Sequence, residues 1–142
     1  MRRNELSNGF SLIEVLLVLA IIGIISGIAI PTFLGQRRRA RVVGDAMSNA
    51  KVMAMQLEGL KADTGIYGSL GTYTWVAGSA VGSAASLLPG FSANKGNTKM
   101  NYSLSIGGSG LAYTITIVDP SLPGSPTAYQ TDQTGAELIR LQ

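Results

Sequence analysis

The chain contains no cysteine and no histidine. Without cysteine there is no disulfide and no inference about the redox compartment. The two absences together remove the commonest general base, the thiol nucleophile and the usual transition-metal ligands. The carboxylates are few and scattered, and no base is spaced to activate a serine or a threonine. We therefore expect that the protein is not an enzyme and holds no cofactor.

Charged residues are also scarce. They make up 13% of the 142 residues, against about 25% in a typical soluble domain, whereas hydrophobic residues make up 46%. Many of these lie in the apolar run from 10 to 34, which is long enough to cross a bilayer as a helix. Two arginines precede the run and four follow it, so the flanking charges do not fix its orientation. An uncleaved membrane anchor is one interpretation of this segment.

A basic cluster follows the apolar run directly, and it consists of Arg37, Arg38, Arg39 and Arg41. Its position indicates a patch beside the lipid headgroups. No second basic face is visible, and the chain without residues 1–9 would carry nine basic against seven acidic residues. Binding to nucleic acid is therefore not indicated.

The residues before the apolar run are short and basic. Residues 1–9 read MRRNELSNG, and a Gly9-Phe10 junction opens the run. A secretory signal would instead place a cleavage site at small residues after its apolar stretch. The segment GFSLIE, from Gly9 to Glu14, resembles the class III leader junction of type IV pilins and type II secretion pseudopilins.

This resemblance implies how the chain is processed. In that family a prepilin peptidase cuts after the glycine on the cytoplasmic side and methylates the new terminal residue. Here the cut would follow Gly9, the methyl group would go to Phe10, and residues 1–9 would be a leader peptide. The resemblance covers residues 1 to about 60. It also implies a precursor in the bacterial inner membrane, surrounded by lipid bilayer, which the inner-membrane assembly machinery adds to an extracellular filament of identical subunits.

Residues 10–62 are expected to form one long helix. Its first part, 10–34, is apolar all round and would be the transmembrane and filament-core segment. Pro31 lacks a backbone donor and matches the family's helix-bending proline, so together with Gly27 it predicts a bend or local melting of the helix. The second part, 35–62, is amphipathic. Its apolar residues recur at spacings of three and four: Val43, Ala46, Met47, Ala50, Met53, Ala54, Leu57 and Leu60.

Residues 63–142 are expected to form a globular head, which makes the fold α+β and pilin-like. The first part, 65–98, is a connector rich in glycine, serine and alanine. It is longer than an ordinary loop, so it should hold short elements or be functional. The residues expected to anchor it to the core are Tyr73, Trp75, Val76, Leu87, Leu88 and Phe91.

The rest of the head, about 99–141, predicts a four-stranded antiparallel sheet with one face on the helix. Apolar and polar residues alternate over 100–106 and 111–117, with a glycine-rich turn between them. A second hairpin is expected from strands at 127–131 and 136–141. The first hairpin's apolar residues are Met100, Tyr102, Leu104, Ile106, Leu111, Tyr113, Ile115 and Ile117.

Glu14 is the residue that we expect to guide assembly, because it is the only charged residue between Phe10 and Gln36. A carboxylate in hydrocarbon is costly and usually finds a partner. Cleavage after Gly9 would create an α-amine on Phe10 at a matching depth. The resemblance implies that the glutamate of one subunit pairs with this amine on a neighbour. The plainer alternative is a carboxylate that is tolerated close to the headgroups.

Asp119 and Asp132 are weak candidates for calcium ligands. At one end of the sheet, with hydroxyl and carbonyl oxygens around them, they could supply part of the roughly six to eight oxygens that calcium takes. The resemblance adds that several major pseudopilins carry calcium in a C-terminal loop. Both residues stand in turn-forming sequence, and ordinary turn residues are the favoured interpretation, so no metal is expected.

Two classes of function follow from these features. The first is a structural subunit of a type IV pilus-like filament, with a type II secretion pseudopilin as the alternative in the same class. The loop at 119–124 lacks the aromatic residues of many major pseudopilins, which favours a pilus. The absence of a cysteine pair, in turn, departs from many major pilins. The second class is a monomeric membrane-anchored binding protein, with 65–98 as its ligand surface.

Overall fold

The structure, a computed structural model, describes residues 9–77, 79–91 and 100–142. It divides into two compact units, one ending at Arg37 and the other running from Arg38 to Gln142. A long helix, α1 (Leu12–Thr64), belongs to both units. In the first unit α1 is exposed along its whole length, and only Ser26 is half-buried. By length and composition α1 can cross a membrane.

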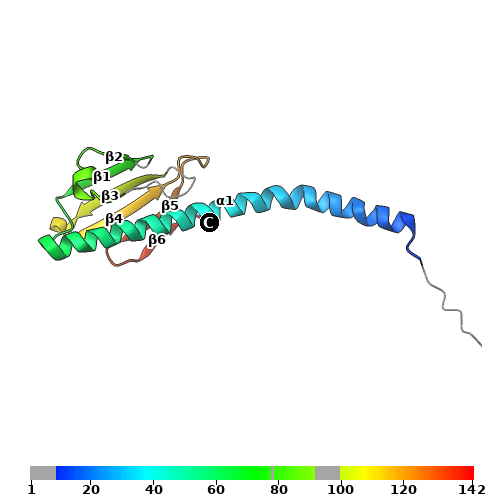
Figure 1. Ribbon diagram of the computed structural model, residues 1–142, viewed down its shortest axis with the longest axis horizontal. Helices are drawn as coiled ribbons and strands as arrows, with labels where there is room; N and C mark the ends of the chain where they lie inside the picture. The colour runs from blue at the N-terminus through cyan, green and yellow to red at the C-terminus, as the bar shows by residue number, and fades with distance from the viewer. Residues whose placement is uncertain (1–8, 78, 92–99) are drawn as a thin grey trace, which may run out of the picture. The chain divides into compact units, whose positions relative to one another are not determined.

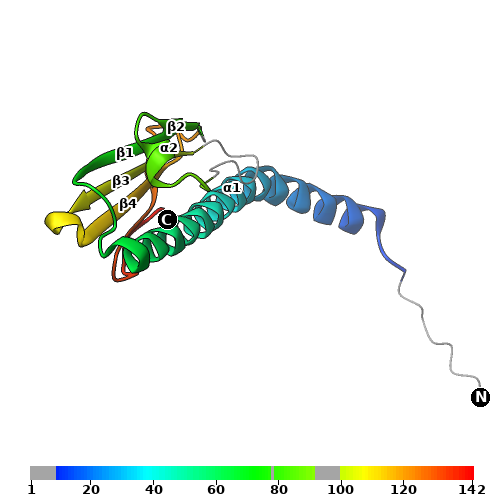
Figure 2. The ribbon, with the colours of Figure 1, turned by 60° about the vertical axis from the view of Figure 1, so that its left-hand side comes forward.

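The second unit is the head, in which residues from Arg38 onward pack on an antiparallel sheet (Figure 1). The strand order is β2-β1-β3-β4-β5-β6. A short helix, α2, contacts β1 and β2, and Figure 2 shows it beside that end of the sheet. The elements after α1 are β1 (Gly71–Val76), β2 (Ser79–Val81), α2 (Ala84–Leu87), β3 (Asn101–Gly107), η1 (Gly108–Gly110), β4 (Ala112–Val118), β5 (Thr127–Asp132) and β6 (Glu137–Arg140).

The predicted fold class is confirmed, because a long apolar helix is followed by an antiparallel sheet on which its C-terminal part packs. The predicted count of four strands is wrong, since β1 and β2 extend the sheet beyond β3 to make six. Both extra strands lie in the segment expected to be a connector. The glycine-, serine- and alanine-rich sequence around both strands concealed them, although in β1 itself Tyr73 and Trp75 alternate with threonines.

The core lies between the sheet and one face of α1. The helix contributes Val42, Val43, Ala46, Asn49, Ala50, Met53 and Leu57, all buried. In β3 and β4, buried apolar residues alternate with less buried polar residues as predicted, with one exception. Leu111 is 53% exposed because it ends η1 in a helical conformation, one residue before β4 begins. Val76, expected as an anchor, is also about half exposed, whereas Trp75 is buried against Phe91.

A polar contact joins the helix to the sheet inside this core. Asn49 donates a hydrogen bond of 2.7 Å from Nδ2 to the hydroxyl of Tyr102, and both residues are buried. Tyr102 in turn packs edge-on against Phe91, with 5.4 Å between ring centroids. Asn49 was not predicted as a core residue because periodicity counts apolar side chains only. A buried amide that pairs with a buried hydroxyl fixes the register between α1 and β3.

We expect the head to lose stability as the pH rises above about 10. Burial, as the main cause, raises the pKa of Tyr102 and of Tyr113 from 10 to about 12. Between these values the unfolded chain releases phenolic protons that the folded chain keeps, so unfolding becomes easier. Each tyrosine therefore contributes about 2–3 kcal/mol that is fully present below pH 10 and lost toward pH 12.

Denaturant titrations of the purified chain at a series of pH values measure this loss, with the emission wavelength of Trp75, the single tryptophan, as the signal. The control is Tyr113→Phe, which keeps the edge-on contact with Tyr67, at 4.7 Å between ring centroids, but cannot ionise. It should remove about half of the pH dependence. If the denaturant concentration at the midpoint of unfolding is the same at pH 9 and at pH 11.5, the prediction is wrong.

Candidate functional site

The leader junction lies at the start of α1 and is fully accessible. Gly9 and Phe10 precede the helix in non-helical backbone, and Phe10 is 82% exposed. The first turn forms when the Ser11 carbonyl accepts hydrogen bonds from the backbone N–H groups of Glu14, at 3.1 Å, and Val15, at 3.3 Å. A Cβ atom added at Gly9 would meet no atom within 4 Å. The fold therefore does not require glycine at this position, and any such requirement comes from a partner.

Glu14 lies in the first turn of α1 and is exposed. Among residues 9–77, 79–91 and 100–142 the one ion pair joins Arg140 and Glu137, and Glu14 has no charged partner there. In the precursor the nitrogen of Phe10 belongs to a peptide bond and carries no charge. The pairing of Glu14 with a Phe10 amine, which only cleavage would create, stays a prediction.

The stretch around Gly27 and Pro31 is helical in the single chain. Pro31 has no N–H group for the Gly27 carbonyl, so this helix carries one unfilled acceptor. The next residue, Thr32, bonds to two other carbonyls of this stretch. The Thr32 hydroxyl donates to the carbonyl of Ala29 at 2.8 Å and lies 3.3 Å from that of Ile28. Bending or melting of this stretch in an assembled filament stays a prediction.

The two calcium candidates lie at opposite ends of the sheet. Thr114 pairs with Asp132, so Asp132 lies beside the start of β4, whereas Asp119 follows the end of β4. Five residues of strand separate the two positions, which is about 17 Å. The expectation that they could approach each other is therefore wrong. Among the described residues, moreover, no three acidic side chains gather in a way that could hold a metal ion.

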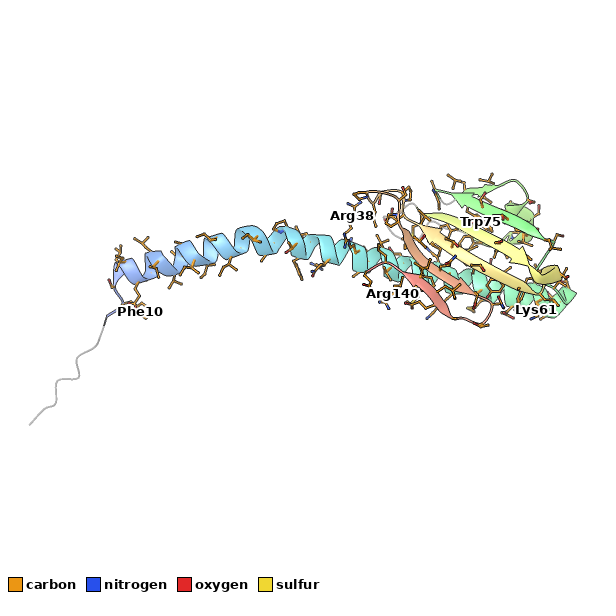
Figure 3. The ribbon with its side chains drawn as sticks, turned by 180° about the vertical axis from the view of Figure 1, so that it is seen from behind. Phe10, Arg38, Lys61, Trp75 and Arg140 are labelled. Carbon is orange, nitrogen blue, oxygen red and sulfur yellow. The ribbon has the colours of Figure 1, made fainter. Side chains whose placement is uncertain are left out.

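Each aspartate instead forms a turn. Asp132 accepts hydrogen bonds from the backbone and hydroxyl of Thr134, at 2.9 and 2.6 Å, which lower the pKa of its carboxyl group. Asp119 Oδ1 accepts from the backbone and hydroxyl of Ser121, at 2.8 and 2.5 Å. Ser121 in turn accepts from Arg38 at its carbonyl, 3.1 Å, and at its hydroxyl, 3.2 Å. Figure 3 labels Arg38 at the sheet end that carries this loop.

The turn at Asp119 could be predicted from its sequence, but its contact with Arg38 could not. Aspartate commonly accepts a hydrogen bond from the backbone two residues on. Asp119 is nevertheless fully buried, and its Oδ2 atom has no hydrogen-bond partner in the described part of the chain. Arg38 and Ser121 are 83 positions apart, and no local pattern links residues at that separation. The contact connects the loop after β4 to the residue of α1 at which the second unit begins.

The comparisons with known proteins agree with the accessible junction. Residues 6–30 match the prokaryotic N-terminal methylation motif. No curated protein and no solved structure matches the chain. The chain thus carries a type IV pilin-like class III leader, and the match supports a precursor of the type IV pilin or pseudopilin kind. The motif points to a structural protein rather than an enzyme.

Proposed function

We propose that the chain is a structural subunit of a type IV pilus-like filament. A prepilin peptidase removes residues 1–9 in the inner membrane and methylates Phe10, and assembly machinery in that membrane adds the subunit to the growing filament. The main observation behind this proposal is the methylation motif at residues 6–30. The motif lies at the start of α1, whose apolar first part packs on no other described part of the chain. Other copies of the same helix, bundled in a filament core, would cover this surface.

The hydrophobic core of the head also supports this role. All of its residues come after Arg38, so the head can remain folded both at the membrane surface and on a filament. The segment 9–37 adds no buried residue to that core and is free to exchange lipid for protein neighbours. A subunit that moves from a bilayer into an extracellular filament needs this division of roles.

A type II secretion pseudopilin is the alternative, and one observation favours it. Asp119 is fully buried in the loop after β4, and its Oδ2 atom has no hydrogen-bond partner among the described residues. Such an oxygen would suit the C-terminal calcium site that several major pseudopilins carry. The same loop lacks the aromatic residues expected of a pseudopilin. A monomeric membrane-anchored binding protein is a further alternative. It is disfavoured because two parts of its expected ligand surface, 71–76 and 79–81, form strands of the sheet.

Shearing of cells tests the proposal. We expect long fibres in the sheared material, with this chain as their main component, identified by intact mass without residues 1–9 and with one added methyl group. A deletion of the gene should remove the fibres, and the full-length gene should restore them. A processed chain that stays in the membrane fraction while cells lose protein secretion would favour a pseudopilin. An unprocessed chain would favour the anchored binding protein.

A further inference from the structure

The head contains a pocket that neither processing nor filament assembly explains. It lies between α1 and the end of β6, with a volume of about 670 Å³. Arg140, labelled in Figure 3, lines it from β6, and Arg39 lines it from α1. We call it the Arg39–Arg140 pocket. Its other lining residues are Ala40, Val43, Gly44, Met47, Glu137, Leu141 and Gln142.

The two arginines are only weakly engaged. Arg39 donates one long hydrogen bond of 3.3 Å to a backbone oxygen of Gln142, the last residue. Arg140 lies 3.8 Å from the Glu137 carboxylate, and these two side chains are 56% and 41% exposed. An exposed ion pair of this kind contributes little to stability. Both guanidinium groups can therefore turn toward an incoming anion at small cost, and a guanidinium is well suited to a phosphate.

The wall between the arginines is apolar. Ala40, Val43 and Met47 line it from α1, and Leu141 lines it from the chain end. Gly44 opens the helix side, because no atom lies within 4 Å of the position that a Cβ would take. Pockets for small molecules typically enclose about 300–1,000 Å³ and combine apolar walls with a few polar groups. The Glu137 carboxylate also lines the pocket, but its two cationic groups and its apolar wall together suit an amphiphile with an anionic head.

The chain itself keeps this pocket close to a membrane. Leu34 ends the apolar run, and Arg39 follows it by five residues. Five residues span at most about 17 Å, however the two units are oriented. The headgroup layer on each side of a bilayer is about 5–7 Å thick. Whenever residues 10–34 span the membrane, the chain thus keeps the backbone of Arg39, one of the two arginines of the pocket, within about 17 Å of the hydrocarbon edge.

We propose that the Arg39–Arg140 pocket binds one anionic phospholipid of the surrounding membrane. The two guanidinium groups hold the headgroup phosphate, and the apolar wall contacts the glycerol and the upper acyl chain. The proposal goes beyond the filament role, because it concerns the precursor in its membrane, whether or not filaments form. The lipid would tie the head to the membrane surface before assembly.

Native mass spectrometry of the full-length chain in detergent, titrated with phosphatidylglycerol, tests this proposal. We expect one tightly retained lipid on the wild type. The double variant Arg39→Gln, Arg140→Gln should bind it at least about tenfold more weakly, since each lost bond involves a charged group. The matched control is Arg41→Gln, an exposed arginine of the same helix that does not line the pocket. It should bind as the wild type does.

A second variant tests the open volume of the pocket independently of its charged residues. Gly44→Leu keeps every arginine, finds open space in the fold and fills the pocket from the helix side, so it should also lose the lipid. Trp75 emission reports whether each variant's head is folded. Equal weakening by Arg41→Gln and the double variant would overturn the proposal, as would full retention of lipid by Gly44→Leu.

The ligand is tested with two further probes. Inorganic phosphate should not displace the lipid, because it lacks the apolar part, and phosphatidylcholine should bind more weakly, because its choline cation meets the two arginines. Complete displacement by phosphate would identify a phosphate site and overturn the lipid proposal. Equal binding of phosphatidylcholine would overturn the preference for an anionic headgroup. A wild-type chain that retains no lipid would overturn both. Filament shearing is read independently of all these measurements.

Discussion

Replacing Gly9 with valine is expected to leave the precursor uncut. The residue on the leader side of the scissile bond must pass close to the peptidase at the membrane edge, where a branched side chain would obstruct it. Misplacing a scissile bond by about 1 Å can slow a reaction on the order of 100-fold. The structure sharpens this expectation. A Cβ at position 9 has no neighbour within 4 Å, so the fold itself tolerates the change.

Intact mass of the membrane-bound chain measures the result. The wild type should lose residues 1–9 and gain one methyl group, whereas Gly9→Val should keep its full length. Gly23→Val is the matched control, because Gly23 lies in the same apolar segment and a Cβ there also has open space. It should be processed normally. Mature protein of normal mass from Gly9→Val would refute the assignment of the cleavage site.

The sequence predicted the segments whose signal is local. Alternation of apolar and polar residues placed β3 and β4, and the spacing of apolar residues placed the buried face of α1. The leader junction was found because its residues are contiguous. Strands β1 and β2 were missed because the segment around them is rich in glycine, serine and alanine, and their place in the sheet depends on the pairing of β1 with β3 and of β2 with β1.

Contacts between distant parts of the chain could not be predicted from local patterns. The bond from Asn49 to Tyr102 and the bonds from Arg38 to Ser121 each join residues more than 50 positions apart. The expectation that Asp119 and Asp132 could approach each other was wrong for the same reason. The antiparallel register of β4 and β5 places the two residues at opposite ends of the sheet. Nor could the Arg39–Arg140 pocket be predicted, since it combines the two ends of the head sequence.

Replacing Glu14 with leucine is expected to abolish filaments while leaving the earlier steps intact. The variant segment is more apolar and should still insert into the membrane. Cleavage after Gly9 should continue, since that bond lies well before residue 14 in the chain and Glu14 makes no ion pair with any described residue. In the proposed filament, the Phe10 amine of one subunit and the Glu14 carboxylate of another are both removed from water and from the lipid headgroups. We therefore expect the amine to require a partner only at the assembly step.

The expected effect is large although the pair itself need not add stability. Desolvation of two charges roughly offsets their attraction, so a buried pair contributes little net free energy. Removing one partner is different, because the Phe10 amine of the neighbour is then buried unpaired, at a cost of about 3–5 kcal/mol. This corresponds to a loss of about 100-fold or more in the equilibrium for adding each subunit. A subunit shifted along the axis suffers the same penalty, so the pair selects the register.

The measurement compares the amounts of the chain in membrane and sheared-filament fractions for wild type, Glu14→Leu and Glu14→Gln. Glutamine keeps the size and polarity of the side chain and removes its charge, so it should fail almost as completely as leucine if the charge is what matters. All three chains should show the mature mass, which confirms that processing preceded the block. Abundant, normally ordered filaments from Glu14→Leu would show that Glu14 is a tolerated carboxylate near the membrane edge. If Glu14→Gln forms filaments and Glu14→Leu does not, a hydrogen bond to the Phe10 amine is sufficient and the ion pair is not required. In that case the neutral amide already keeps the amine from being buried without a partner.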